Sequence, residues 1–300
     1  MPNLLDIRRR IRSVRNMRQI TKAMKMVSAA KLRRAQEQAL AARPYAQRLE
    51  ALLASVAARV DAGEVLAGAA GEGAELAGRL LIQRDERRIA LLVISADSGL
   101  AGAFNANAFK AAVQFAREHP GAEIAWEAIG RKARDYYRRR AVRLSGEHVG
   151  LFTRRAVDYQ AARGIAAEQL RRYAEAEVDA VYLIGNEFKS VLQQRVVTRR
   201  LLPVAAPEAG EAAAGDAIFE PPPPELLAAL LPRYVEAQVY RALLESFAAE
   251  HAARMNAMDT ATKNAGDLLD DLTLNMNRVR QAAITKEIIE VVGGAAAQAG

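Results

Sequence analysis

Hydrophobic residues near the start of the chain recur in steps of three and four positions. The series is Ile7, Ile11, Val14, Met17, Ile20, Met24 and Val27. Residues at this spacing share one face of an α-helix, and the spacing is close to that of a left-handed coiled coil. Residues 3–60 contain no glycine, so we predict one long helix with Asn3 as its N-terminal cap. Pro44 is expected to kink this helix or to mark a local break.

A second helical stripe occupies the end of the chain. Its members are Met258, Ala261, Ala265, Leu268, Leu272, Met276, Val279 and Ala283. We predict a helix over residues 225–292, which would be roughly 100 Å long at the α-helical rise. A domain of this size cannot bury that length, so we expect the two terminal helices to pair as a coiled coil. Gly293 and Gly294 each cost about 1 kcal/mol relative to alanine in a helix, so residues 293–300 are expected to fray.

Between these helices, strand and helix patterns alternate. Residues 88–95, RIALLVIS, form a continuous apolar run of the kind found in strands that are buried on both faces. Further strands are predicted at residues 123–130, 179–188 and 193–204, and helices at residues 105–118, 131–140 and 158–177. This order indicates a small α/β domain in which helices pack on a mostly parallel, Rossmann-like sheet.

The predicted organisation has five blocks, and the fold class is α/β with a long helical coiled coil. A connecting loop or weak helix, rich in Gly, Ala and Glu, follows the first helix, and a linker ending in four prolines precedes the last. The blocks are the N-terminal helix 1–60, the connection 61–87, the inserted α/β domain 88–204, the Pro-rich linker 205–224 and the C-terminal helix 225–300.

Composition restricts the location and the chemistry of the protein. The chain has 300 residues, a net charge of +8 and no cysteine, which excludes disulfides, thiolate nucleophiles and cysteine metal sites. The N-terminal segment is too charged for a signal peptide, and no apolar run approaches the ~20 residues that span a bilayer. We therefore expect a cytosolic protein that is peripheral on a membrane or bound to a complex.

Positive charge is concentrated in the first helix. From Arg8 to Arg34 the sequence contains eleven Lys and Arg residues and no acidic residue. Like charges on one helix repel each other, so this helix is expected to face an acidic partner. Nucleic acid and the acidic loops of partner proteins both fit this expectation, and the periodicity does not separate them.

Candidate catalytic chemistry is sparse. Residues 94–105, ISADSGLAGAFN, join a predicted strand to a helix, and their glycines could cradle a phosphate. The segment matches neither glycine-rich nucleotide motif, so a tight turn is the favoured interpretation. His119, His148 and His251 lack ligand spacing and are interpreted as surface or incidental residues. We predict no catalytic site, no cofactor and no metal.

Two motifs are specific to one protein family: ITKAMKMV in the N-terminal helix and RQAAITKEIIEVV in the C-terminal helix. Through these motifs the sequence resembles the gamma subunit of the rotary, F-type ATP synthase, and the resemblance extends over the whole length and in order. Ser98 and Ala101 depart from the family's turn motif, where a basic residue and often a cysteine stand. The segments that carry the resemblance are residues 7–36, 95–105, 129–140 and 254–297.

The resemblance implies a non-catalytic central rotor subunit, with one copy per complex. The two long helices would form an antiparallel coiled coil inside a ring of three alpha and three beta subunits. The α/β domain would contact the membrane c-ring and the epsilon subunit, and the basic helix would face acidic loops of the beta subunits rather than nucleic acid. The subunit would couple proton flow to ATP synthesis and regulate it, at the cytoplasmic face of the bacterial cell membrane.

The family motifs also assign contact residues. Met24 and Lys25 match positions where the N-terminal helix meets the moving loops of the beta subunits. The corresponding positions of the C-terminal helix are Arg254, Arg280, Gln281, Thr285 and Glu287. Gln281 and Thr285 are four residues apart, and Arg280 and Glu287 are seven apart, so each pair shares a helix face.

Two other functions compete with the rotor. An α/β enzyme that uses nucleotides would need a phosphate loop and a placed acid, and the sequence has neither. A basic coiled-coil protein that binds nucleic acid would show affinity that falls steeply with salt. That hypothesis leaves the ITKE segment of the C-terminal helix unexplained.

Overall fold

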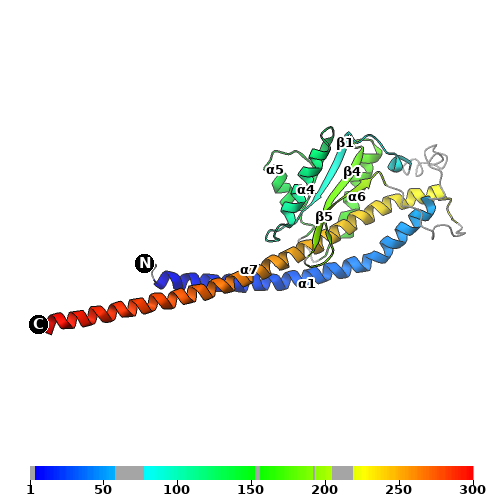
Figure 1. Ribbon diagram of the computed structural model, residues 1–300. Helices are drawn as coiled ribbons and strands as arrows, with labels where there is room; N and C mark the ends of the chain where they lie inside the picture. The colour runs from blue at the N-terminus through cyan, green and yellow to red at the C-terminus, as the bar shows by residue number, and fades with distance from the viewer. Residues whose placement is uncertain (1–3, 58–77, 153–155, 192, 205–218, 300) are drawn as a thin grey trace. The chain divides into compact units, whose positions relative to one another are not determined.

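The computed structural model describes residues 4–57, 78–152, 156–191, 193–204 and 219–299. The chain divides into two compact units, Met1–Ser28 together with Arg254–Gly300, and Ala29–Ala253. Two long helices, α1 (Leu4–Ala57) and α7 (Pro223–Ala299), contribute to both units. The sheet lies wholly in the second unit (Figure 1).

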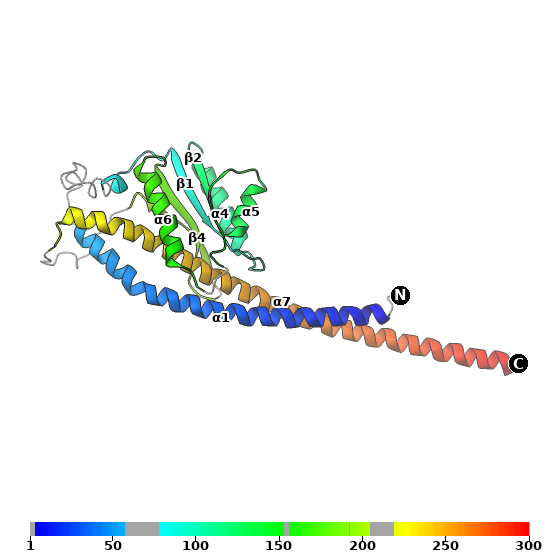
Figure 2. The ribbon, with the colours of Figure 1, turned by 180° about the vertical axis from the view of Figure 1, so that it is seen from behind.

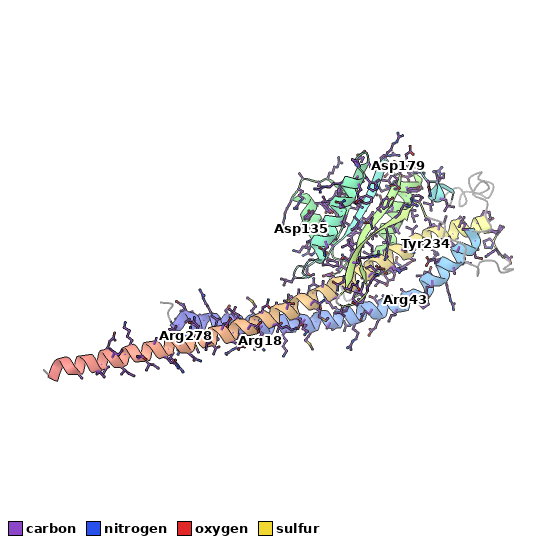
Figure 3. All side chains as sticks on the ribbon, viewed as in Figure 1. Arg18, Arg43, Asp135, Asp179, Tyr234 and Arg278 are labelled. Atoms are coloured by element: carbon purple, nitrogen blue, oxygen red, sulfur yellow. The ribbon has the colours of Figure 1, made fainter. Side chains whose placement is uncertain are left out.

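Both predicted long helices are confirmed. α1 has 54 residues and continues through Pro44, so the alternative of a local break is wrong. The ribbon instead bends in this stretch, near the labelled Arg43 (Figure 3). A bend accommodates the proline ring and the lost N–H donor while the rest of the hydrogen-bond ladder is kept.

The ends of α7 differ from the prediction. The helix begins at Pro223, so the last two residues assigned to the linker form its first turn. Proline is tolerated there because first-turn N–H groups have no partner within the helix. The helix also continues through Gly293 and Gly294 to Ala299, seven residues past the predicted end at Val292. The alanines that follow have the highest helix propensity and offset the two glycines.

The inserted domain contains a five-stranded sheet in the order β3-β2-β1-β4-β5. Strands β3, β2, β1 and β4 are parallel, and β5 is antiparallel to β4. This confirms the mostly parallel sheet that the alternating pattern predicted. The strands are β1 (Arg88–Ile94), β2 (Glu123–Ile129), β3 (Leu144–His148), β4 (Ala180–Phe188) and β5 (Gln194–Leu202), and the helices α4 (Phe104–Glu118), α5 (Arg131–Arg138) and α6 (Tyr159–Ala174).

Helices cover both faces of this sheet. Phe109 of α4 and Tyr137 of α5 pack in one hydrophobic cluster with Leu91 of β1. Figures 1 and 2 show α6 on the opposite face, where its residues Leu170 and Tyr173 are buried. Six of the seven residues of β1 are buried, as the continuous apolar run of this strand predicted.

The N-terminal part of α7 packs directly on the antiparallel edge of the sheet. The Ser246 hydroxyl accepts a hydrogen bond from the backbone N–H of Asn186, at 3.1 Å. A Cβ atom on Gly185 would lie 2.9 Å from the same hydroxyl, so glycine permits this approach. Arg199 of β5 also pairs with Glu245 of α7 at 2.6 Å.

Strand β3 was absent from the sequence prediction. Its five residues, LSGEH, contain one apolar side chain, and the strand alternates between half-buried and exposed positions. β3 lies at the edge of the sheet, where one neighbour supplies its hydrogen bonds and no apolar run is required. Such a strand gives almost no periodic hydrophobic signal.

A glycine between β2 and α5 allows this connection to lie directly against the backbone that follows β1. Gly130 links β2 to α5 with φ of 94°, and its N–H donates to the carbonyl of His148 at 2.7 Å. A Cβ atom at this position would lie 2.1 Å from the carbonyl oxygen of Ser95. Both the left-handed conformation and the contact therefore require glycine.

We predict that Gly130→Ala destabilises the inserted domain by roughly 3 kcal/mol, because strain and backbone overlap add. Gly121→Ala is the matched control, since a Cβ atom there meets nothing within 4 Å. Urea unfolding of the two full-length variants measures the difference. Equal stability of Gly130→Ala and Gly121→Ala would contradict the assigned contact.

Candidate partner-contact site

The unit formed by Met1–Ser28 and Arg254–Gly300 is an antiparallel helix pair with an apolar seam at one end. Ile7 and Ile11 of α1 are buried together with Leu269 of α7. Val14, Leu272, Met276 and Val279 pack against this cluster. These contacts confirm the predicted pairing of the terminal helices in this unit.

Polar contacts continue the seam beyond this cluster. The hydroxyls of Thr21 and Thr262 lie 2.8 Å apart in hydrogen-bond contact. Lys25 Nζ donates to Asp259 Oδ1 at 2.6 Å. Because positions advance along α1 as they recede along α7, the contacts also establish the antiparallel direction.

The seam follows a heptad spacing that differs from the predicted apolar stripe. On α1 it runs through Ile7, Ile11, Val14, Thr21, Lys25 and Ser28, and on α7 through Met258, Thr262, Ala265, Leu269, Leu272, Met276 and Val279. Four residues of the predicted stripes are instead exposed: Met17, Ile20, Val27 and Leu268. Ala283 is also exposed, beyond the last seam contact. Because polar residues occupy part of the observed seam, the prediction from apolar residues chose neighbouring positions instead.

Met24, Lys25 and Arg254 lie in this unit with different environments. Met24 is half-buried beside the seam. The Lys25 side chain is 40% exposed and is held by Asp259, so its first role is within the helix pair. Arg254 is buried, with 7% of its surface exposed. Contact of Met24 and Lys25 with a partner stays a prediction.

The remaining predicted contact residues lie past the end of the seam. Arg280, Gln281, Thr285 and Glu287 are all exposed on α7, beyond Val279. The Thr285 hydroxyl donates to the backbone carbonyl of Gln281 at 2.9 Å, so its oxygen can still accept a hydrogen bond.

The same stretch of α7 exposes a large apolar surface. Exposed fractions reach 65% at Ile289 and 71% at Val291. Contiguous exposed apolar residues of this kind usually mark a surface that binds a partner. The exposed members are Ile284, Ile288, Ile289, Val291 and Val292.

Charge on the helix pair is unevenly distributed. Residues 1–28 contain eight Lys and Arg residues and one acidic residue. Figure 3 labels Arg18 of this segment and, on α7, Arg278. The hydrogen bond from Lys25 lowers the pKa of Asp259, and the charges of Lys25 and Lys263 lower it further. α7 therefore compensates part of the positive charge of α1 and leaves a basic surface.

The turn after β1 is filled by its own side chains. Asp97 is buried and accepts hydrogen bonds from the backbone N–H groups of Arg131, Gly150 and Phe152 at 2.9–3.0 Å. Ser95 Oγ accepts from the N–H of Ala133 at 2.7 Å. The carboxylate and the hydroxyl thus tie this turn to the N-terminus of α5, whereas the phosphate considered from the sequence would lie at the N-terminus of α4 (Phe104–Glu118). These bonds give the side chains of Ser95 and Asp97 a structural role.

The histidines differ from one another more than predicted. His148 Nε2 lies 3.6 Å from Glu127, a buried carboxylate that also pairs with Arg172. His251 is 2% exposed and packs edge-on to Phe247, so of the two predicted alternatives, surface or incidental, the first is wrong for this residue. In the part of the chain that the structure describes, no three His, Cys, Asp or Glu side chains form a metal cluster. Within those same ranges no helix is both long and apolar enough to cross a membrane.

The chain combines a paired-helix unit with an inserted α/β domain. The exposed apolar end of α7 indicates a protein of the class that acts by binding partners. The ATP synthase family profile matches residues 3–298. The ATP synthase gamma chain of Solibacter usitatus is 56% identical over 297 residues, covering 99% of both chains. That of Pelotomaculum thermopropionicum is 48% identical, again covering 99% of both chains. The chain belongs to the ATP synthase gamma chain family.

Solved structures agree on the fold. A chain of the Euglena gracilis mitochondrial ATP synthase, in a structure of OSCP, F1 and c-ring, aligns with a TM-score of 0.64 at 18% identity. The alignment covers 98% of this chain and 94% of that one. A chain from the Tetrahymena thermophila mitochondrial central stalk and c-ring aligns with a TM-score of 0.57 at 24% identity, covering 81% of this chain and 99% of that one.

The Lys25–Asp259 contact gives a charge-exchange test. Lys25→Glu or Asp259→Lys alone places like charges at the contact, so each is expected to lower the thermal unfolding midpoint. The double variant should restore most of the loss, and comparing all four proteins isolates the pair energy. Thermal unfolding of the full-length chain at low salt measures it.

The lowered pKa of Asp259 determines how the stability contributed by the Lys25–Asp259 pair depends on pH. Because the folded pKa of Asp259 is lowered, the pair stabilises the fold above the unfolded pKa of about 3.9. That stabilisation is lost as the pH falls through the folded value. A double variant that unfolds as early as the single variants would show that the contact contributes nothing.

Proposed function

We propose that this chain is the central rotor subunit of a proton-translocating ATP synthase, peripheral at the cytoplasmic face of a bacterial membrane. The observation that carries the proposal is the end of α7, which leaves the helix pair after Val279 and exposes an apolar surface. Large exposed apolar surfaces are rare on monomeric proteins, and an enclosing partner would remove this one from water. Membership in the gamma chain family identifies the complex.

In this proposal the chain performs no bond chemistry. One copy binds within the hexamer of alpha and beta subunits, and it also contacts the epsilon subunit and the c-ring. Rotation changes which beta subunit each face of the shaft touches. A change in contact shifts a beta subunit between states only as far as the shaft binds those states differently.

The predicted contact residues supply two kinds of contact, and of these residues Arg254 is buried within the chain and Met24 and Lys25 are half-buried. Met24 and Lys25 on α1 meet the moving part of the beta subunits, next to the basic surface of the helix. Arg254, Arg280, Gln281, Thr285 and Glu287 form the contact on α7. The exposed amide of Gln281 and hydroxyl oxygen of Thr285 are suited to hydrogen bonds with partner backbone or side chains.

Purification of the chain with and without its alpha and beta subunits tests the proposal. The isolated chain should hydrolyse no ATP and bind no nucleotide tightly, whereas the reconstituted complex should hydrolyse ATP. ATPase activity in the isolated chain would falsify the rotor function. Salt-sensitive binding to DNA, without assembly into the complex, would support the nucleic-acid alternative instead.

The contact on α7 gives a second prediction. Gln281→Leu combined with Thr285→Val removes hydrogen-bonding groups worth about 0.5–1.5 kcal/mol each. We expect steady ATP turnover of the assembled complex to fall roughly tenfold, with assembly nearly unchanged.

The matched control is Asn264→Leu combined with Thr260→Val. Thr260 is also exposed on α7 and also donates to the carbonyl four residues earlier, here that of Asn256. This control should retain turnover. An equal loss in the two double variants would count against a specific contact at Gln281 and Thr285.

A further inference from the structure

The inserted domain holds α7 through two glutamates of that helix. Glu236 lies against α6, where its Oε2 accepts a hydrogen bond from the Tyr159 hydroxyl at 2.8 Å and its Oε1 lies 3.8 Å from Arg163 Nε. Nine residues later, Glu245 Oε2 accepts a hydrogen bond from Arg199 of β5 at 2.6 Å. Figures 1 and 2 show α6 and β5 beside this part of α7.

The two glutamates project from opposite sides of α7. A separation of nine residues is about two and a half turns of an α-helix, so the two side chains leave the axis about half a turn apart. Glu236 therefore reaches the helix that covers one face of the sheet, while Glu245 reaches the antiparallel edge strand. Rotation of α7 about its own axis, in either direction, would move both carboxylates away from their partners.

Both carboxylates are themselves held in place. Glu245 Oε1 accepts a hydrogen bond from Arg241 Nε, one turn earlier on α7, at 2.8 Å. The side chains of Glu236 and Glu245 are 14% and 17% exposed, and solvent screens such partly buried ion pairs less than exposed ones. Burial, and after it the bond to Glu236, raise the pKa of Tyr159 to about 12, so its hydroxyl remains a donor at neutral pH.

Apolar contacts join the same part of α7 to the domain. Phe247 stacks on Phe152 with ring centroids 5.8 Å apart, and Ala249 packs in a cluster with Phe104. The free energy of apolar burial depends on area and has little directional preference, whereas hydrogen bonds weaken steeply when they are misaligned. The bonds of the two glutamates, together with that of Ser246, therefore determine the rotational position of α7 against the domain.

We propose that Glu236 and Glu245 form a two-sided clamp that transmits torque between the inserted domain and α7. The proposal rests on the proposed function, in which the domain contacts the c-ring and the C-terminal part of α7 contacts the beta subunits. Torque that enters through the domain must pass into α7 before it reaches those contacts. The two glutamates are positioning residues, because neither belongs to the surface assigned to the beta subunits.

The test measures how stiffly the domain is attached to α7 in the full-length chain, assembled with its alpha and beta subunits. The chain has no cysteine and Lys110 is exposed on α4, so Lys110→Cys provides a single thiol on the domain for attaching a bead. The hexamer is fixed to a surface and stalled with a non-hydrolysable ATP analogue. The variance of the bead's angle then reports torsional stiffness, because a softer connection gives a wider distribution of angles.

The clamp variant is Glu236→Ala with Glu245→Ala. It removes the bonds to Tyr159, Arg163 and Arg199 and leaves that of Ser246 to the backbone of Asn186. We expect the angular variance to rise roughly twofold, because most of the directional contacts are lost. ATP hydrolysis by the same soluble complex should stay near the wild-type rate, since the residues assigned to the beta subunits are unchanged.

Two controls separate loss of the clamp from loss of charge or of stability. Glu168→Ala with Glu177→Ala removes two carboxylates that pair with arginines of α6. Phe115→Leu loosens the packing of a cluster whose described members include no residue of α7. Thermal unfolding of each full-length chain measures the stability lost, and both controls should keep the wild-type angular variance.

Wild-type variance in the clamp variant would overturn the proposal. An equal rise in Phe115→Leu would also overturn it, because the softening would then follow stability. If the double variant does not assemble, Glu245→Ala alone is compared with the same controls, and a variance no larger than theirs contradicts the clamp. If the wild-type chain itself does not assemble with the hexamer, the proposed function fails as well, so the two failures are distinguishable.

Discussion

An apolar stripe on a helix must be buried, and this requirement explains the organisation of the chain. The stripe of α1 has its partner on α7, at the other end of the sequence, so everything between them is an insertion. The antiparallel seam in the terminal unit contains an apolar cluster around Ile7, Ile11 and Leu269, followed by the polar contacts of Thr21 and Lys25. Because the seam ends at Val279, the final part of α7 is left for another molecule to cover.

The polar part of the seam contributes specificity more than stability. Ion pairs at partly exposed positions add little free energy, because water and salt screen them. A single charged pair at a seam position still disfavours every alignment that would place Lys25 or Asp259 against an apolar residue. The same choice of side chains leaves Met17, Ile20 and Val27 on the outer surface, where they are available to partners.

Prediction from the sequence succeeded where the local pattern of residues determines which side chains are buried. It failed where segments distant in the chain determine this. The strand β1 was found because both of its faces are buried, so six of its seven residues are apolar. The edge strand β3 was missed because a half-exposed strand needs no apolar run. The predicted stripe of α1 was right at Ile7, Ile11 and Val14, and from Ile20 onward it lay one position away, because Thr21 and Lys25 are buried or paired only through their contacts with α7.

The candidate functional residues divide in the same way into those that the sequence identified and those whose environment only the structure shows. The predicted contact residues on α7 came from family motifs, and the structure adds that Gln281, Thr285 and Glu287 are exposed whereas Arg254 is buried. The burial of His251 and the three bonds to Asp97 depend on segments distant in sequence, so no local pattern announces them.

The pairing of the two ends of the chain has a consequence for biosynthesis. Lys25 and Asp259 are 234 residues apart, so at about 5–20 residues per second the ribosome makes the second roughly 10–50 s after the first. During this interval α1 has no helix to pair with, and its positive charge is not yet compensated by Asp259. Folding of the inserted domain in the meantime shortens the loop that must close, which lowers the entropic cost of pairing. The order of synthesis therefore makes the domain the first part to fold and the helix pair the last.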